Sequence, residues 1–317
     1  MDNDLQVLFR RCSVYDRFAI GQIVDDMVGV LGFSGRRWHG KIVLLKPNLI
    51  SAGGPGFSCT HGECIAGIAS WFIDNGARVV LGDSPAFGSG KKVLEKHGIL
   101  QPLSGMDIQF VEFTTPVEKK LACGVNVNIA REALECDLFV GLPKIKAHNQ
   151  MYVTMALKNI FGVVKGVNKA MLHMVHGGSH DHFANIILDL LEFFPDQLHF
   201  ADGIEVMHQS GPLDGSSLLL GCLAGARSPV ALDTAFLDLL ELEAERCPLW
   251  RVAHGRSMSG STIDDIRFPA LQPSAFHGSG FIAPSSLDAV RFSLLKFVRG
   301  MLKRVRLKVG ERNSKRG

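Results

Sequence analysis

Short apolar runs that end abruptly in polar residues recur along the first half of the chain. They occupy residues 41–45, 77–81 and 137–142. Runs of this length, apolar on both faces, are typical of parallel strands covered by helices. Residues 64–75 have the pattern of a helix that leads into the second run, and Gly76 is typical of its C-terminal end. The alternation predicts an α/β fold with a largely parallel sheet and helices on both faces.

The second half of the chain is less regular. Its pattern predicts a helix over 149–160, capped by Asn149, and an amphipathic helix over 180–194, capped by Ser179 and stopped by Pro195. Further elements are expected as strands at 200–204 and 216–223, a helix at 230–244, and loops over 255–286. Residues 1–286 therefore form the predicted α/β domain, either as one body or as two lobes.

The C-terminal tail, residues 287–317, differs from this domain in charge. Apolar residues recur at helical spacing over 287–309, and basic residues occupy the other face. Residues 291–317 carry +9, so residues 1–290 carry −6 of the net +3 of the chain. Such a basic amphipathic helix either contacts an anionic membrane surface or a partner protein, or packs its apolar stripe on its own domain. Few aromatic residues and an acidic body argue against nucleic-acid binding.

The cysteines and the N-terminus indicate the compartment. Seven cysteines are scattered without a C-x-x-C pair, which argues against a disulfide framework, a zinc knuckle and a locally ligated iron–sulfur cluster. The first residues lack the pattern of a signal peptide, and the chain has no apolar run of about 18 residues that could span a membrane. We predict a cytoplasmic protein.

Polar residues follow the predicted strands at the points where these end. In parallel α/β sheets ligands bind outside the carboxyl ends of the strands. The residues gathered there are Lys46, Asn48, Asp83, Ser84, Lys144, Lys146, His148 and Asp202. Several lysines beside amide donors favour an anionic ligand such as a carboxylate or phosphate. The alternative is that they are polar only because strand ends meet solvent.

The segment from Lys144 to His182 is the richest in reactive side chains. On the predicted helix, Thr154 and Lys158 lie four residues apart and share an otherwise apolar face. A lysine there is either a desolvated base or nucleophile, or one whose stem packs while its ammonium group reaches water. His173 and His176 have a spacing that suits two ligands of one metal ion, an acid–base pair, or structural roles.

The stretch Gly141–His148, followed by Val153–Gly162 and by Lys169 with His173, resembles the domain-of-unknown-function 362 family. Flanking motifs extend this resemblance over roughly residues 40–240: Lys46-Pro-Asn48, Gly82-Asp-Ser-Pro85, Ala201-Asp-Gly-Ile204, Gly211-Pro212 and Ala231-Leu-Asp233. The resemblance implies little about activity. Many relatives carry a ferredoxin-like segment that binds an iron–sulfur cluster, but this chain lacks its closely spaced cysteines, so we expect no such cluster.

The order of His, Lys, a Gly-rich turn and His is also faintly similar to the nickel-pincer lactate racemases. In that family a lysine anchors the cofactor, while histidines ligate nickel or move protons. This second likeness serves only to rank the hypotheses.

Three hypotheses follow. The favoured one is an enzyme of isomerase, lyase or racemase type that acts on a small anionic metabolite, with His148, Lys158 and His173 as general acids or bases. Its predicted substrate-binding residues are Lys46, Asn48, Asp83, Ser84, Lys144, Lys146, Thr154, Asn159 and Lys169. The second is an enzyme that uses a divalent metal or another cofactor, held near His148, His173 and His176. The third is a non-catalytic anion-binding module that docks through its basic tail. The substrate, any cofactor and the oligomeric state stay open.

Overall fold

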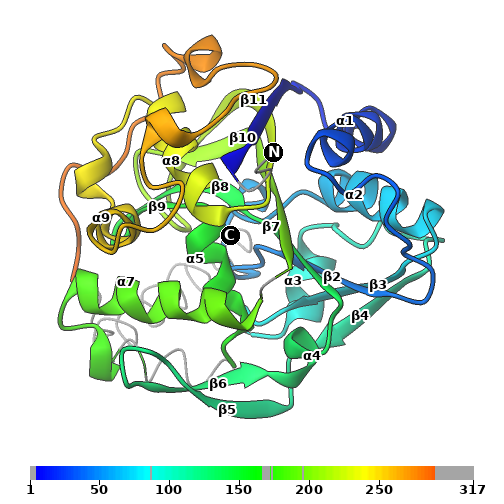
Figure 1. The fold of residues 1–317 in the computed structure, drawn as a ribbon, viewed down its shortest axis with the longest axis horizontal. Helices are drawn as coiled ribbons and strands as arrows, with labels where there is room; N and C mark the ends of the chain where they lie inside the picture. The colour runs from blue at the N-terminus through cyan, green and yellow to red at the C-terminus, as the bar shows by residue number, and fades with distance from the viewer. Residues whose placement is uncertain (1–4, 86–87, 166–171, 173, 195, 290–317) are drawn as a thin grey trace, which may run out of the picture.

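The computed structural model describes residues 5–85, 88–165, 172, 174–194 and 196–289. These residues form a central nine-stranded sheet and a separate two-stranded ribbon (Figure 1). The strands of the central sheet are β1 (Val7–Arg11), β2 (Ile42–Pro47), β3 (Arg78–Asp83), β4 (Ile108–Glu112), β7 (Leu138–Leu142), β8 (Lys144–His148), β9 (Tyr152–Thr154), β10 (Gln197–His208) and β11 (Ser216–Ala226). The ribbon pairs β5 (Pro116–Lys120) with β6 (Asn126–Ala130).

The central sheet has a parallel core with antiparallel additions. Its strand order is β1-β11-β10-β7-β2-β3-β4, and every pair from β10 to β4 is parallel. The long strand β10 pairs first with β7 and then, beyond Pro143, with β8, which in turn pairs antiparallel with the short strand β9. The predicted α/β class with a largely parallel sheet is confirmed.

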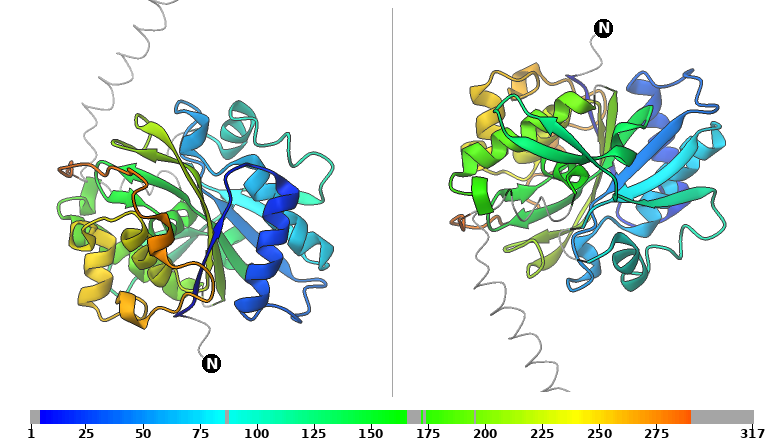
Figure 2. Two further views of the ribbon diagram at one scale, coloured as in Figure 1. Left: turned by 90° about the horizontal axis from the view of Figure 1, so that it is seen from above. Right: turned by 90° about the horizontal axis from the view of Figure 1, so that it is seen from below.

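Helices cover both faces of the sheet, as the edge-on views show (Figure 2). One face carries α1 (Arg17–Val30), α2 (Gly62–Asp74) and α3 (Gly90–Lys96), and the other carries α5 (Ala156–Ile160), α7 (His180–Asp189), α8 (Pro229–Leu239) and α9 (Pro248–Gly255). A short helix, α4 (Arg131–Leu134), follows the β5–β6 ribbon. Each helical layer buries its apolar side chains against the sheet in a core of its own, so the sheet itself is buried on both sides.

Most elements agree with the hydrophobic pattern. The three apolar runs of the first half are β2, β3 and β7, and the predicted helix before Gly76 is α2, which begins two residues earlier behind an N-cap at His61. Ser179 caps α7 as predicted, with its hydroxyl accepting a hydrogen bond from the amide of His182. Helix α9 reaches Gly255, and residues 256–286 contain no further strand or α-helix; two isolated bridges tie them to the start of the chain, Gln6 with Arg267 and Phe9 with Leu271.

The helix predicted over residues 149–160 is wrong. The chain instead leaves β8 through a turn, forms β9, and begins α5 only at Ala156. Asn149 therefore caps no helix, and Thr154 and Lys158 do not share a helical face. The apolar spacing of this segment fits a helix locally. Pairing of β9 with β8 buries the same side chains, and the segment adopts this arrangement in place of the helix.

Several predictions fall on residues that the structure does not describe. Lys169 and His173 lie outside the described residues, and so does the tail from residue 290 onward. The amphipathic helix expected over 287–309 therefore stays a prediction.

Candidate functional site

Two buried ion pairs stand at the carboxyl ends of the parallel strands. Lys46 is the last residue but one of β2, and its Nζ lies 2.7 Å from Oδ1 of Asp83, the last residue of β3. Lys144 begins β8, and its Nζ lies 2.9 Å from Oδ2 of Asp202 on β10. Both lysines are 1% exposed. Burial lowers the pKa of Lys46 while Asp83 opposes the shift, so the carboxylate offsets part of the desolvation that this ammonium suffers.

Lys144, Lys146 and His148 come from one face of one strand. They occupy alternate positions of β8, and successive side chains of a strand point to opposite sides. All three are buried. They therefore lie along a strand of the sheet, whereas the sequence pattern predicts them only as polar residues that follow the end of a strand, here β7. The reason is β10, which extends past the end of β7 and offers β8 a second pairing partner.

A chain of hydrogen bonds links Lys46 to Lys146 through two asparagines. The Lys46 ammonium donates to Oδ1 of Asn159 at 3.1 Å, and Nδ2 of Asn159 donates back to the carbonyl of Lys46 at 3.0 Å. Asn48 donates to the same Asn159 oxygen at 3.4 Å and accepts from Nζ of Lys146 at 2.7 Å. The Lys146 ammonium also donates to the carbonyl of Ser58 at 2.6 Å. The structure thus joins four predicted binding residues in one network: Lys46, Asn48, Lys146 and Asn159.

Asp83 is fixed by more than Lys46. Its two carboxylate oxygens accept hydrogen bonds from the backbone amides of Leu49 and Ser84, each at 2.8 Å. Three donors therefore share the charge of Asp83, and its role is to hold Lys46 and the two loops that follow β2 and β3. Ser84, a predicted binding residue, contributes its backbone amide to the hydrogen bonds of Asp83.

Lys146 and Lys158 lack the carboxylate partners that Lys46 and Lys144 have. Within the described part of the chain, neither forms an ion pair with an acidic side chain. Burial lowers the pKa of Lys146 to about 7; the charges of Lys158 and Lys144 add to this shift, and the negative charges of a Cys59 thiolate and of Asp83 oppose it. The ammonium of Lys158 is enclosed by protein although its side chain keeps some exposed surface, and burial together with the charge of Lys46 lowers its pKa to about 8. Its Nζ lies 5.1 Å from the ring centre of Phe161.

Thr154 brings an unused hydroxyl group to Lys146. The two residues are direct cross-strand partners in the β8–β9 pair, so their side chains leave the same face of the sheet. Thr154 is 3% exposed, and among the described residues its Oγ1 has no hydrogen-bond partner. A buried hydroxyl without a partner costs about 1–3 kcal/mol, which a bound oxygen or nitrogen atom would offset.

His148 closes the same strand. Its Nδ1 accepts hydrogen bonds from the amides of Gln150 at 3.1 Å and Met151 at 3.3 Å. Because Nδ1 is the acceptor, the proton of the neutral ring resides on Nε2. This tautomer makes His148 a donor toward whatever faces Nε2.

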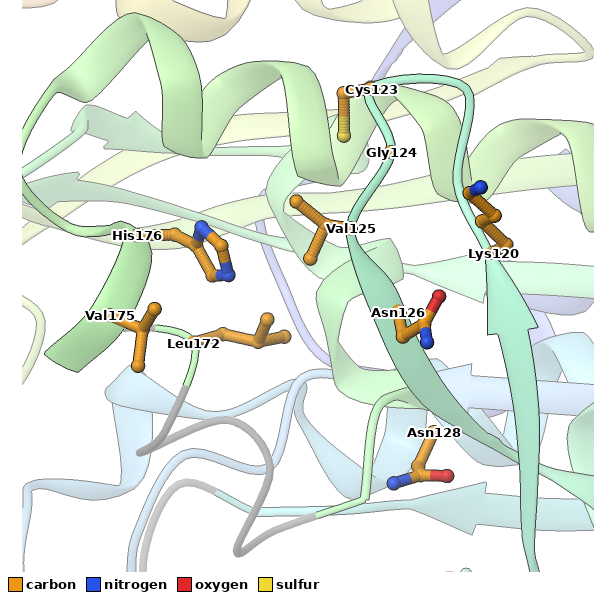
Figure 3. Close-up of a pocket in the computed structure, with 9 residues that line it drawn as sticks. All are labelled: Lys120, Cys123, Gly124, Val125, Asn126, Asn128, Leu172, Val175 and His176. Atoms are coloured by element: carbon orange, nitrogen blue, oxygen red, sulfur yellow. The ribbon is translucent and has the colours of Figure 1, made fainter.

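His176 lies at a different place from the buried lysines. It lines a cavity of about 690 Å³ together with residues of the β5–β6 ribbon, and none of the four lysines Lys46, Lys144, Lys146 and Lys158 lines it (Figure 3). Its Nδ1 lies 3.0 Å from Nε2 of His182. Across the described ranges, no three His, Cys, Asp or Glu side chains are grouped so that they could hold a metal ion. The predicted set of His148, His173 and His176 stays untested, because His173 is outside these ranges.

Sequence reasoning missed Tyr15. Its hydroxyl accepts from Lys144 at 2.7 Å and donates to Oδ1 of Asp202 at 2.8 Å, and its ring stacks on His61 with the centroids 3.7 Å apart. Tyr15 therefore completes the Lys144–Asp202 pair. It lies 129 residues before Lys144, in the turn before α1, and no local motif marks it.

The comparisons with known proteins agree with the motifs around these lysines. The family model described as a domain of unknown function, DUF362, matches residues 43–238. The chain belongs to the DUF362 family. The match includes every described residue of the lysine network, whereas Tyr15 lies outside it. A thylakoid-associated protein of Synechocystis sp. is 33% identical over 266 residues, which cover 83% of each chain.

Two solved structures resemble the fold of this DUF362 chain at low sequence identity. One is a protein from Thermotoga maritima, with a TM-score of 0.43, 12% identity and 66% of the present chain covered. The other is the lactate racemase apoprotein from Thermoanaerobacterium thermosaccharolyticum, with a TM-score of 0.48, 14% identity and 75% covered. The matches span only 54% and 58% of those two chains. In the part of the DUF362 chain that the structure describes, no helix has the length and apolar character needed to cross a membrane.

Proposed function

We propose that this DUF362 chain binds a small carboxylate or phosphate and transfers a proton on it, with Lys146 and Lys158 as the central groups. The observation that carries the proposal is the contrast among four lysines. Lys46 and Lys144 are neutralised by Asp83 and Asp202, while Lys146 and Lys158 have no acidic partner among the described residues. A bound anionic ligand would provide the negative charge that Lys146 and Lys158 do not receive from an acidic side chain.

The altered basicity of these two lysines supports proton transfer as well as binding. A general acid or base is most effective when its pKa lies near the working pH. With pKa values of about 7 and about 8, Lys146 and Lys158 each exist in both protonation states near neutrality. In its neutral form either amine takes a proton from a carbon beside the bound carboxylate, and the resulting ammonium returns it. This cycle is that of a racemase or isomerase. In a lyase the deprotonated substrate would instead expel a leaving group from the neighbouring carbon, and the ammonium would protonate that group.

The other groups have supporting roles in the proposal. The hydroxyl of Thr154, which faces the Lys146 side of the sheet, donates to an oxygen of the ligand. Nε2–H of His148 is a further candidate donor or acid on the same strand. Asn48 and Asn159 orient the two ends of the network through hydrogen bonds to Lys146 and Lys46. Among the remaining predicted residues, Lys169 and His173 stay predictions.

A proton-transfer function can be tested without knowing the substrate. The chain is incubated in D₂O with a panel of small hydroxy, keto and amino acids, and NMR follows exchange of the hydrogen beside the carboxylate. We expect exchange for at least one member, lost in Lys158→Met, and phosphate or carboxylate binding by calorimetry weakened about tenfold or more in Lys146→Met. Lys41→Met is the matched control, because Lys41 is exposed and already paired with Asp137. Binding that is equal in all three variants would contradict the proposal.

The same measurements separate the two alternatives. Binding without exchange, together with loss of vesicle binding after removal of residues 291–317, would favour the non-catalytic module docked through its tail. Exchange that depends on stoichiometric metal in anaerobically purified protein would favour the metal-dependent enzyme. For that second alternative, the 3.0 Å approach of His176 and His182 beside the cavity is the supporting observation.

A further inference from the structure

The short helix that carries Lys158 does not cap its own first turn. The residue before α5, Met155, is extended and has no side-chain hydrogen bond to the helix. A side chain from α8 does this instead. The two carboxyl oxygens of Asp233 accept hydrogen bonds from the backbone amides of Ala156, at 2.7 Å, and Leu157, at 3.1 Å.

Asp233 occupies a costly position for a carboxyl group. It is 2% exposed, and no cationic side chain of the described chain pairs with it. Burial raises the pKa of Asp233 to about 8 against the effect of the two backbone amides. A serine or asparagine in place of Met155 would cap α5 at lower cost. Asp233 does what such a local cap cannot, because it ties the start of α5 to a second helix.

The other end of α5 is held against Lys46. Asn159 exchanges hydrogen bonds with the ammonium and the carbonyl of Lys46. Directly after the helix, a side chain at Gly162 would collide with the Lys46 ammonium and with Oδ1 of Asp83. The helix is therefore clamped between Asp233 and Lys46. Lys158 lies between these two clamps, and its Nζ lies 5.1 Å from the ring centre of Phe161.

We infer that Asp233 is a positioning residue that places Lys158 and Asn159 for the reaction through its hydrogen bonds to the first turn of α5. The inference rests on the proposed function, because it gives Asp233 a role toward the same lysine. It predicts that a change at Asp233 alters the pKa of Lys158 and the rate of proton transfer, and not only the stability of the protein.

The test uses Asp233→Asn in the full chain, since the amide keeps the shape but turns one acceptor into a donor that faces a backbone N–H. We expect the deuterium-exchange rate at saturating substrate to fall about tenfold or more, with a much smaller change in the concentration for half-saturation. We also expect the pH midpoint of Lys158, followed by NMR of the side-chain Cε signal in protein labelled with ¹³C-lysine, to shift. Asp189→Asn is the matched control. Asp189 is also 2% exposed and accepts a hydrogen bond from the backbone amide of Cys123. Unlike Asp233 it also pairs with Arg256, and among the described residues it has no hydrogen bond to α5.

Each outcome decides something. Loss of stability in both variants with an unchanged Lys158 profile and rate would overturn the inference and leave Asp233 as a structural cap. If Asp233→Asn does not fold, Asp233→Glu keeps the carboxyl group but displaces it, and the same shifts are expected there. If the wild-type chain neither binds anions nor exchanges deuterium while Asp233→Asn still moves the Lys158 midpoint, the proposed function fails and the positioning role stands.

Discussion

Two neighbouring positions on one strand show that buried lysines can have very different surroundings. Lys144 and Lys146 lie two residues apart on β8, point to the same face, and are each 1% exposed. Lys144 meets Asp202 and Tyr15, whereas Lys146 meets only neutral oxygens, those of Asn48 and Ser58, among the hydrogen-bond partners found. Burial alone therefore does not mark a functional lysine. The two lysines differ in whether a carboxylate compensates their charge, and our proposal gives the ligand-binding role to the one without it.

The largest expected effect concerns the ion pair between Lys144 and Asp202. Asp202→Asn would leave the ammonium of Lys144 buried without its carboxylate, and loss of one partner of a buried pair costs about 3–5 kcal/mol. Chemical denaturation of the variant should show this loss in the free energy of unfolding. The double variant Lys144→Met with Asp202→Asn should recover most of it, because no uncompensated charge then remains. A loss in the double variant as large as in the single one would mean that packing, not charge, dominates at this ion pair.

The second prediction concerns Lys146, which has no acidic partner, and the pH dependence of its contribution to stability. The pKa of Lys146 is about 7 in the folded chain against 10.5 when unperturbed. Between these values the unfolded chain binds a proton that the folded chain does not, so the contribution of Lys146 to stability rises with pH from about 7 to 10.5. The difference in unfolding free energy between wild type and Lys146→Met should therefore change in favour of wild type by on the order of 3 kcal/mol from pH 7 to pH 10. A difference that is flat over this range would show that Lys146 stays charged when folded.

This contrast between the two lysines marks what the sequence could and could not predict. Apolar runs locate β2, β3 and β7, and the rule of strand ends gathers Lys46, Asp83 and Lys146 at one edge of the sheet. Which lysine receives a carboxylate depends on the register that sets Asp202 opposite Lys144, and a single sequence carries no local signal for it.

Contacts between distant segments were equally hidden from the sequence. Tyr15 and Asp233 reach the site from 129 and 77 residues away from the groups they bond. The helix predicted over 149–160 fails because β9 pairs with β8, and β8 is itself held in the sheet by the distant strand β10.

The smallest expected effect concerns a single atom beside Lys146, the hydroxyl oxygen of Thr154. Thr154→Val keeps the shape of the side chain but removes the hydroxyl that has no partner among the described residues. Because the folded chain then no longer buries an unsatisfied polar atom, we expect its unfolding free energy to stay equal or to rise by about 1 kcal/mol. Anion binding measured by calorimetry should weaken by about tenfold at most, since one hydrogen bond to the ligand is lost. A variant that is both less stable and unaltered in binding would mean that the Thr154 hydroxyl stabilises the fold and does not contact the ligand.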